Sequence, residues 1–368
     1  MMEFDTAMAL FSDDCVRELA ESDDGLRFLK LRSLSRREHL ETLFEVASIT
    51  PQASSARGMF KEAFETIAVD QEIINETISQ IYASERKERR AKEPELVNQL
   101  YRLDVFDWGG LHQNSLEKTI VDNYVKKIRD YDHLSQSIEN ELHNSMRGYV
   151  LCSWYNHWTS ILIEDIFRDH AAVLPAVGLI KKIDFFLNGV PFDLKVTYFP
   201  EGYIKDCRRE NNQRPELTLL RQWARRNRVP FSTDLPDSRL LSDLWNKASD
   251  DPSDDGQQVL VELNTFRQKL IQDGQVNPSN LIRWLYENQG VRRFDASNRL
   301  FLVLIDSSNF FESWKLKRAK PLLDSEITRF LDNVSSSPGR SLKFTWEGST
   351  YTVVSDAIII TKPQGQRT

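Results

Sequence analysis

Asp184, Asp193 and Lys195 lie close together in an apolar-rich segment that runs from residue 179 to residue 200, LIKKIDFFLNGVPFDLKVTYFP. Carboxylates and backbone carbonyls are the ligands that hard divalent cations prefer. A lysine beside such a cation can position or deprotonate a water molecule and offset charge on a phosphorus atom. The three residues are therefore candidates for metal-assisted phosphodiester hydrolysis. The competing interpretation is a solvated face on which lysines neutralise the two acids.

The dipeptide Asn188-Gly189 predicts the element that positions these residues. Both central residues of a type I′ turn need positive φ, and Asn-Gly is the dipeptide that most favours this turn. A two-residue turn there makes the numbers of facing residues sum to 377, so Asp184 faces Asp193 at roughly 5 Å between Cβ atoms, and Lys182 faces Lys195. Alternation along the strands predicts a core face of Ile183, Phe185, Leu187, Val190, Phe192, Leu194, Val196 and Tyr198. The opposite face carries Lys182, Asp184, Phe186, Pro191, Asp193, Lys195 and Thr197.

A strongly apolar helix is predicted before this hairpin, over Tyr149–His170. Its last turns carry Glu164 and Asp165, and one of these acids could lean over the polar face of the hairpin. Spacing does not decide between them. His157 and His170 lack close partners in the sequence and are more typical of a polar contact and a helix end.

Asp184, eight intervening residues and then Asp193-Leu194-Lys195 form a pattern that resembles the PD-(D/E)XK nuclease superfamily, in particular type II restriction endonucleases. The resemblance implies that Asp184 and Asp193 bind Mg²⁺ with the Leu194 carbonyl, that Mn²⁺ can substitute, that Lys195 is the catalytic lysine and that Glu164 is the helix acid. It covers roughly Tyr149–Ile305. The sequence departs from the pattern at Ile183, where proline is usual.

The resemblance implies a Mg²⁺-dependent endonuclease that cuts double-stranded DNA at a specific site. A homodimer would suit a palindromic site, and a cognate DNA methyltransferase would be encoded nearby. Two alternatives remain. One is another nuclease of the superfamily, in repair, transposition or phage defence, and the other is a non-catalytic scaffold that binds DNA or protein.

Basic residues cluster in the second half of the chain. Residues 205–229 hold eight basic and three acidic residues, in a protein whose formal net charge is −7. Such patches could contact DNA, and phosphate contact is favoured over base recognition; taken singly, each arginine is more typical of a surface ion pair. The DNA-binding candidates are Arg208, Arg209, Arg221, Arg225, Arg226, Arg292, Arg293, Arg299, Lys315 and Lys317. A mixed-sign run, residues 85–92, is more typical of a solvated helix face.

Composition places the chain among globular proteins. Its 368 residues are 40% hydrophobic and 28% charged, so the chain can bury a large core and has no overall basic character. The three cysteines are far apart and have no metal-ligand spacing. No apolar run reaches membrane-spanning length, and the start lacks a signal-peptide pattern, so we expect a cytoplasmic protein.

Hydrophobic periodicity predicts an α/β, mixed α+β, protein with a central mixed sheet flanked by helices, as in a restriction-endonuclease-like core, plus a large N-terminal helical region. We expect residues 1–147 to bind DNA, dimerise or regulate, and residues 148–368 to form the nuclease-like domain. Helices are predicted over 15–31, 36–47, 58–84, 116–146, 215–228, 259–272, 280–289 and from about 310 to 334, with a break at Glu93-Pro94. A buried strand is predicted over 300–305, and a second hairpin over 342–346 and 351–361.

Overall fold

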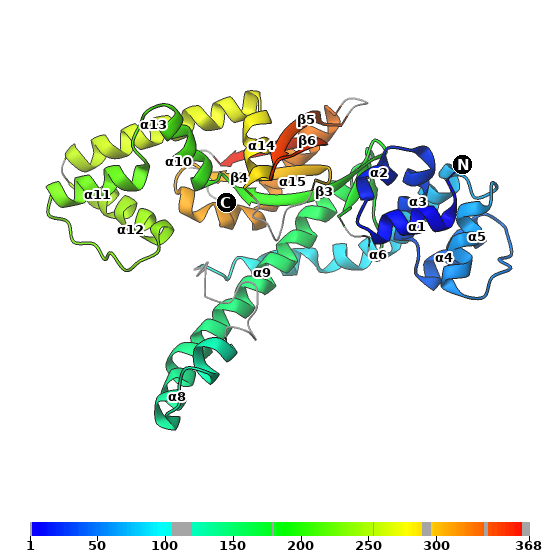
Figure 1. Cartoon of the computed structure of the whole chain (residues 1–368), viewed down its shortest axis with the longest axis horizontal. Coiled ribbons are helices and arrows are strands. Elements are labelled where there is room, and N and C mark those ends of the chain that lie inside the picture. The colour runs from blue at the N-terminus through cyan, green and yellow to red at the C-terminus, as the bar shows by residue number, and fades with distance from the viewer. Residues whose placement is uncertain are drawn as a thin grey trace.

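The computed structural model describes residues 2–104, 120–178, 180, 182–252, 254–288, 296–334 and 338–362. A single six-stranded sheet runs through the centre of this part of the chain, in the order β1-β2-β3-β4-β6-β5 (Figure 1). Its strands are β1 (Val173–Pro175), β2 (Phe185–Leu187), β3 (Val190–Tyr198), β4 (Arg299–Asp306), β5 (Arg340–Trp346) and β6 (Ser349–Lys362).

The sheet is mixed. β3, β4 and β6 are parallel to one another, and the pairs β1–β2, β2–β3 and β5–β6 are antiparallel. All eight residues of β4 are buried, because this central strand has helices on both faces. The predicted mixed sheet, its buried central strand and its C-terminal hairpin are therefore confirmed.

Helices cover both faces of the sheet. α9 (His143–Arg168) and α15 (Lys320–Asp332) pack against one face, on alternate residues of β3, β4 and β6. α10 (Glu201–Glu210), α13 (Asp254–Val276) and α14 (Ser279–Glu287) pack against the other face. α11 (Glu216–Arg226) and α12 (Asp237–Asp250) form a separate small core with α13. The segment η4 (Phe310–Arg318) is a 3-10 helix that leads into α15.

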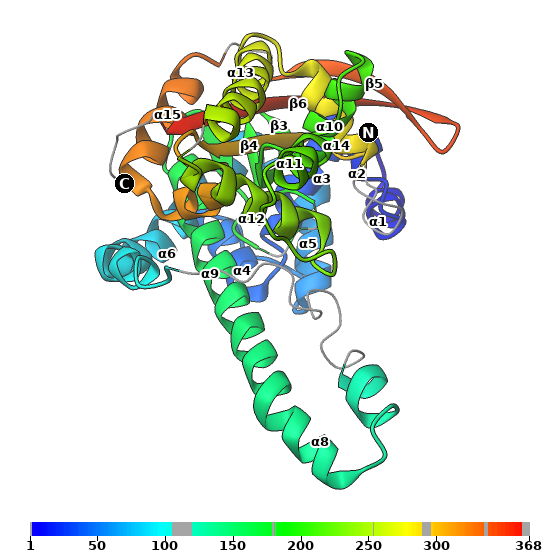
Figure 2. The same ribbon diagram turned by 90° about the vertical axis from the view of Figure 1, so that its left-hand side faces the viewer.

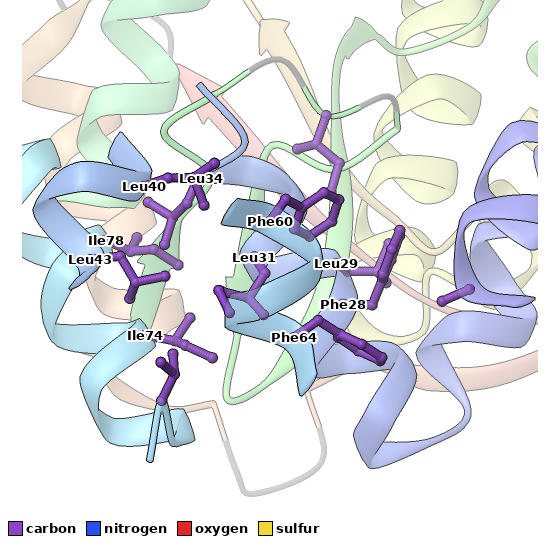
Figure 3. Packing of buried hydrophobic residues seen from close by; sticks show 14 of the residues in the cluster. Phe28, Leu29, Leu31, Leu34, Leu40, Leu43, Phe60, Phe64, Ile74 and Ile78 are labelled. Carbon is purple, nitrogen blue, oxygen red and sulfur yellow. The ribbon is translucent and has the colours of Figure 1, made fainter. Parts of the chain in front are cut away.

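The N-terminal helices have a core of their own that reaches the hairpin. They are α1 (Phe4–Ser12), α2 (Val16–Ala20), α3 (Asp23–Ser33), α4 (Arg37–Val46), α5 (Ala56–Glu65) and α6 (Gln71–Leu100). Figure 3 shows Phe28, Phe60 and Phe64 close together in this cluster, which also includes Ile183 and Phe186 from the hairpin segment. The N-terminal helices thus share buried surface with the segment that carries the candidate site.

α9 projects away from the rest of the molecule together with α8 (Tyr131–Ser137), η1 (Val121–Val125) and η2 (Ile138–Leu142) (Figure 2). Because α9 begins at His143, the domain boundary predicted between residues 147 and 148 falls inside this helix. A single helix therefore connects the two predicted regions.

Three helix predictions were wrong in the same way, because a local capping signal overrode the hydrophobic periodicity. Asp130 caps α8 by accepting from the His133 N–H, which divides the helix predicted over 116–146, of which residues 120–146 are described. Ser22 caps α3 by accepting from the Gly25 N–H, which divides the helix predicted over 15–31. Asp70 caps α6, which divides the helix predicted over 58–84. Conversely, α6 continues through Pro94, because its last turns pack against α9 and η4. None of the described helices is long and apolar enough to cross a membrane.

Candidate active site

The β2–β3 turn has the geometry predicted from Asn188-Gly189. Both residues have positive φ, 47° and 84°. The pairs Phe185–Phe192, Phe186–Pro191 and Leu187–Val190 follow the predicted register. Phe185, Leu187, Phe192 and Leu194 all face the core under α9 and α15, as expected.

The predicted pairing holds from the turn outward as far as Phe185–Phe192 and does not extend to Asp184, the next residue. Asp184 lies outside β2, and its N–H donates to the Phe192 carbonyl at 2.8 Å, so Asp184 is not paired directly with Asp193. Lys182 has φ of 63°, and its Nζ lies 2.9 Å from Asp14, so the predicted pairing of Lys182 with Lys195 is wrong. The left-handed residue ends the alternation, so Ile183 leaves its predicted core face and packs into the N-terminal core. Phe186 reaches the same core because it lies on the opposite face of β2, as alternation predicts.

The Asp184 side chain takes over a hydrogen bond of β3 where β2 no longer pairs with it. Its Oδ2 accepts the N–H of Leu194 at 2.7 Å, which satisfies a donor that β2 no longer reaches. The N–H and C=O of a residue point to the same side of a strand, so the Leu194 carbonyl is directed towards the same end of β2. The Asp184 carboxylate and the Leu194 carbonyl therefore lie on one side of β3.

Asp193 and Lys195 lie on one face of β3, two residues apart. Lys195 Nζ is 2.6 Å from Asp193 Oδ1, and Arg299 Nε is 3.3 Å from Asp193 Oδ2. Asp193 is buried at 6% exposure, whereas the Lys195 side chain is 47% exposed. Lys195 is therefore the member of the group that solvent or a substrate reaches most readily.

Of the two adjacent acids on α9, Glu164 belongs to the site. Its carboxylate is 2.8 Å from Arg168, one helical turn later, and the Arg168 guanidinium donates to the Asp184 carbonyl at 3.2 and 3.3 Å. Arg168 thus connects the helix acid to the first acid of the hairpin. The spacing of four residues between Glu164 and Arg168 is a helical pairing signal that could have identified this arginine from the sequence.

Asp165 has a structural role. It is 2% exposed and accepts from Arg89 at 2.8 and 2.9 Å, and Arg86 lies 3.5 Å away. Arg86 also binds Asp169 and Glu93. We call this group of five charged side chains the α6–α9 clamp. The interpretation of residues 85–92 as a solvated face is wrong for Arg86 and Arg89, which hold α6 against α9.

Electrostatics support the grouping of the three acids. Burial raises the pKa of Asp184, and repulsion from Asp193 raises it further, while the Leu194 N–H, Arg168 and Lys195 lower it. Burial also raises the pKa of Glu164, with repulsion from Asp184 and Asp165 against attraction from Arg168 and Lys195. The acids therefore interact with one another and with the same two cations.

The donor set suits a hard divalent cation in kind. Asp184, Asp193 and the Leu194 carbonyl supply oxygen donors, and the crowded acids would be relieved by a bound positive charge. In the described ranges, however, no three His, Cys, Asp or Glu side chains are arranged as a metal site. Asp193 is paired with Lys195 and Arg299, so a metal ion bound by Asp193 would compete with these two cations for its oxygens.

Several predicted DNA-binding residues are structural. Arg208 is 1% exposed and binds the Arg214 carbonyl and Glu262, each at 2.6 Å. Lys317 is 7% exposed and donates to Asn156 at 3.0 Å, and burial lowers its pKa to about 8. Arg299 binds Asp193 within the site. These three side chains are unavailable to DNA because the tertiary structure buries them.

The other basic candidates differ in exposure. Arg225 and Arg226 are exposed at the end of α11, and Arg209 is exposed at 3.7 Å from Asp206. Arg221 lies 3.1 Å from Asp237, and Lys315 is paired with Glu312 at 2.8 Å. The two remaining candidates, Arg292 and Arg293, lie outside the described residues. His170 Nε2 lies 3.0 Å from Asp332 near the end of α9, as expected of a helix-end residue.

Comparisons of the chain with models of known families, with curated proteins and with solved structures give no significant match.

Proposed function

We propose that this protein is a Mg²⁺-dependent DNA endonuclease of the PD-(D/E)XK type, most similar to a type II restriction endonuclease. The observation that carries the proposal is the convergence of Glu164, Asp184, Asp193 and Lys195 from α9, the loop before β2, and β3. A mixed sheet with helices on both faces is compatible with the core that this superfamily shares.

The residues have distinct parts in this proposal. When bound, Mg²⁺ would polarise the phosphoryl oxygen and lower the pKa of a water molecule. Asp184, Asp193 and the Leu194 carbonyl would hold the ion. Lys195 can turn its ammonium from Asp193 towards a phosphoryl oxygen or the attacking water, because its side chain is half exposed. Arg168 keeps Glu164 and the Asp184 backbone in register with each other.

The substrate in this proposal is double-stranded DNA. Exposed Arg209, Arg225 and Arg226 supply positive charge for phosphate contacts in an otherwise acidic protein. A homodimer would place one such site on each strand of a palindrome. Under this interpretation a cognate methyltransferase protects the host sequence.

Cleavage of plasmid DNA tests the proposal. Purified protein is incubated with mixed-sequence plasmid and Mg²⁺, beside Asp184→Asn, Lys195→Ala and the control Lys182→Ala. Lys182 is a matched lysine in the same segment, but it binds Asp14. We expect discrete fragments from the wild type and from the control, and none from the two site variants.

Two results would reject parts of the proposal. Intact plasmid, linear and single-stranded DNA with both Mg²⁺ and Mn²⁺ would reject catalysis and leave the scaffold alternative. An unresolved smear that depends on Asp184 would keep the nuclease and reject site-specific restriction in favour of another nuclease of the superfamily.

A further inference from the structure

A cavity of about 620 Å³ opens at the carboxyl end of β3, and Thr197 forms part of its lining. Alternation along the strand places Asp193, Lys195 and Thr197 on the same face. Two residues of strand span about 7 Å, and successive nucleotides of one strand rise about 3.4 Å. The cavity therefore begins within about two nucleotides of a phosphate held at Lys195.

Aromatic rings form much of the wall of this cavity. Trp284 is fixed by a hydrogen bond from its Nε1 to Asp206 at 3.0 Å. The Arg267 guanidinium lies 4.7 Å from the ring centre of Phe310 and is itself paired with Glu216 at 2.7 and 2.8 Å. The aromatic lining residues are Tyr198, Phe199, Trp284, Phe310, Phe311 and Trp314. Rigid aromatic faces of this kind stack nucleobases with little regard to sequence.

Polar groups from α10 and α12 complete the lining. They are the Glu201 carboxylate, the Ser238 and Ser242 hydroxyls and the Arg239 guanidinium. Burial raises the pKa of the Glu201 carboxylate, and attraction from Arg267 lowers it. A carboxylate accepts, a guanidinium donates and a hydroxyl does both, so the set matches the mixed donors and acceptors at the edge of a base.

A second cavity, of about 490 Å³, adjoins the first and shares Glu201 and Ser238 with it. Its lining includes the basic residues Lys205, Arg209 and Arg221 and the acidic residues Glu201, Glu216 and Asp237. Arg209 and Arg221 have acidic neighbours, whereas Lys205 forms no ion pair with any residue that the structure describes. Glu216 is paired with Arg267 and Asp237 with Arg221, so Lys205 and Arg209 are the cations best placed to meet a phosphate. An aromatic cavity beside these two cations matches the two halves of a nucleotide.

We propose that the aromatic cavity receives one nucleobase turned out of the DNA duplex near the scissile phosphate, and that Lys205 and Arg209 hold the adjoining phosphate. This inference rests on the proposed nuclease function, because the cavity would bind the same DNA substrate on the face of β3 that carries Lys195. A cavity of about 620 Å³ is within the range of small-ligand sites and is large enough for a base removed from its stack.

Binding of mononucleotides to the full chain, without metal and without catalysis, tests the cavity directly. The probes are the four deoxynucleoside 5′-monophosphates, with deoxyribose 5-phosphate as the base-free control, followed by saturation-transfer NMR and calorimetry. We expect at least one nucleotide to bind and the control to bind at least tenfold more weakly. Trp284→Ala should weaken nucleotide binding about tenfold or more, and Trp284→Phe should largely restore it.

Two further variants distinguish a loss of binding at the cavity from a loss of binding through unfolding. A Cβ at Gly202 would lie 2.7 Å from Cζ2 of Trp284, so Gly202→Ala should displace this wall and weaken binding while the aromatic residue remains. Trp158→Ala is a matched control on α9, outside the cavity, and should leave binding unchanged. Equal binding of the base-free control, or no effect of the Trp284 variants, would overturn the inference.

Duplex binding by the uncleaving Asp184→Asn protein completes the test. A mismatched base costs less to extrude than a paired base, so a duplex with one mismatch should bind several-fold more tightly than its matched parent. Trp284→Ala in the same background should abolish that preference. If Mg²⁺-dependent cleavage is found without nucleotide binding or mismatch preference, this inference fails alone. If nucleotides bind but no DNA is cut, the proposed function fails alone.

Discussion

The adjacent acids Glu164 and Asp165 differ by one position in α9 and are expected to respond oppositely to neutralisation. Asp165→Asn removes the charge that Arg89 and Arg86 share in the α6–α9 clamp, whereas Glu164→Gln changes an acid of the candidate site. Both substitutions keep side-chain size. They are therefore matched tests of a structural and a catalytic role.

The magnitude follows from the contacts of Asp165. Removing one partner of a buried ion pair costs about 3–5 kcal/mol. Here the loss is reduced, because Arg89 is 30% exposed and Arg86 keeps Asp169 and Glu93. We expect Asp165→Asn to lower the free energy of unfolding by about 2–4 kcal/mol. Glu164→Gln loses its partly exposed pair with Arg168 and also the repulsion from Asp184, so we expect a change within about 1 kcal/mol.

Urea unfolding followed by circular dichroism measures both effects. A loss of about 3 kcal/mol with an m value of about 3 kcal/mol/M lowers the midpoint by about 1 M. Plasmid cleavage is then measured at a temperature where every variant is folded. We expect Glu164→Gln to be stable and inactive, and Asp165→Asn to be destabilised but active when folded. A stable, inactive Asp165→Asn beside an active Glu164→Gln would refute the assignment of the two acids.

Three further predictions concern the charge of the site, the turn and the basic residues. Because burial raises the pKa of Asp184, the folded protein binds an extra proton between its ordinary pKa of 3.8 and the raised value, so the free energy of unfolding should fall as pH rises through this range. Asp184→Asn should reduce this slope in a metal-free urea titration and leave the part due to the raised pKa of Glu164, and an unchanged slope would contradict the prediction. Gly189→Ala, at φ of 84°, should lower the free energy of unfolding by roughly 1–2 kcal/mol and reduce cleavage, whereas Gly148→Ala, inside α9 with nothing near its Cβ position, should raise it by about 0.5–1 kcal/mol. Similar shifts in melting temperature for the two variants would argue against the role of the turn in holding the site. Arg208→Ala should lower the melting temperature, while Arg209→Ala should weaken DNA binding in a salt titration and leave melting unchanged; the reverse pattern would contradict the assigned burial.

Local sequence was sufficient for the centre of the hairpin. Asn188-Gly189 needs only its own backbone preferences to set the turn, and the turn sets the three pairs from Phe185–Phe192 to Leu187–Val190. The buried strand β4 was also predictable, because a continuous apolar run is typical of a strand covered on both faces. These features depend on neighbours in the chain.

The burial of charges depended on residues distant in the sequence. From the sequence alone, Arg208, Arg299 and Lys317 resemble surface cations. Their partners in the folded protein are Glu262, Asp193 and Asn156, and nothing in the neighbouring sequence indicates these contacts. The choice between Glu164 and Asp165 likewise depended on α6, whose arginines come from about 76 residues earlier.

The sequence by itself determined the types of residue that could do chemistry, the turn between them and the fold class. The tertiary structure decided which of these residues meet. Backbone preferences and apolar periodicity act over a few residues and can be read along the chain, whereas an ion pair forms wherever packing brings two charges together. For that reason the left-handed Lys182, the Asp184–Leu194 contact and the α6–α9 clamp became visible only in the folded protein.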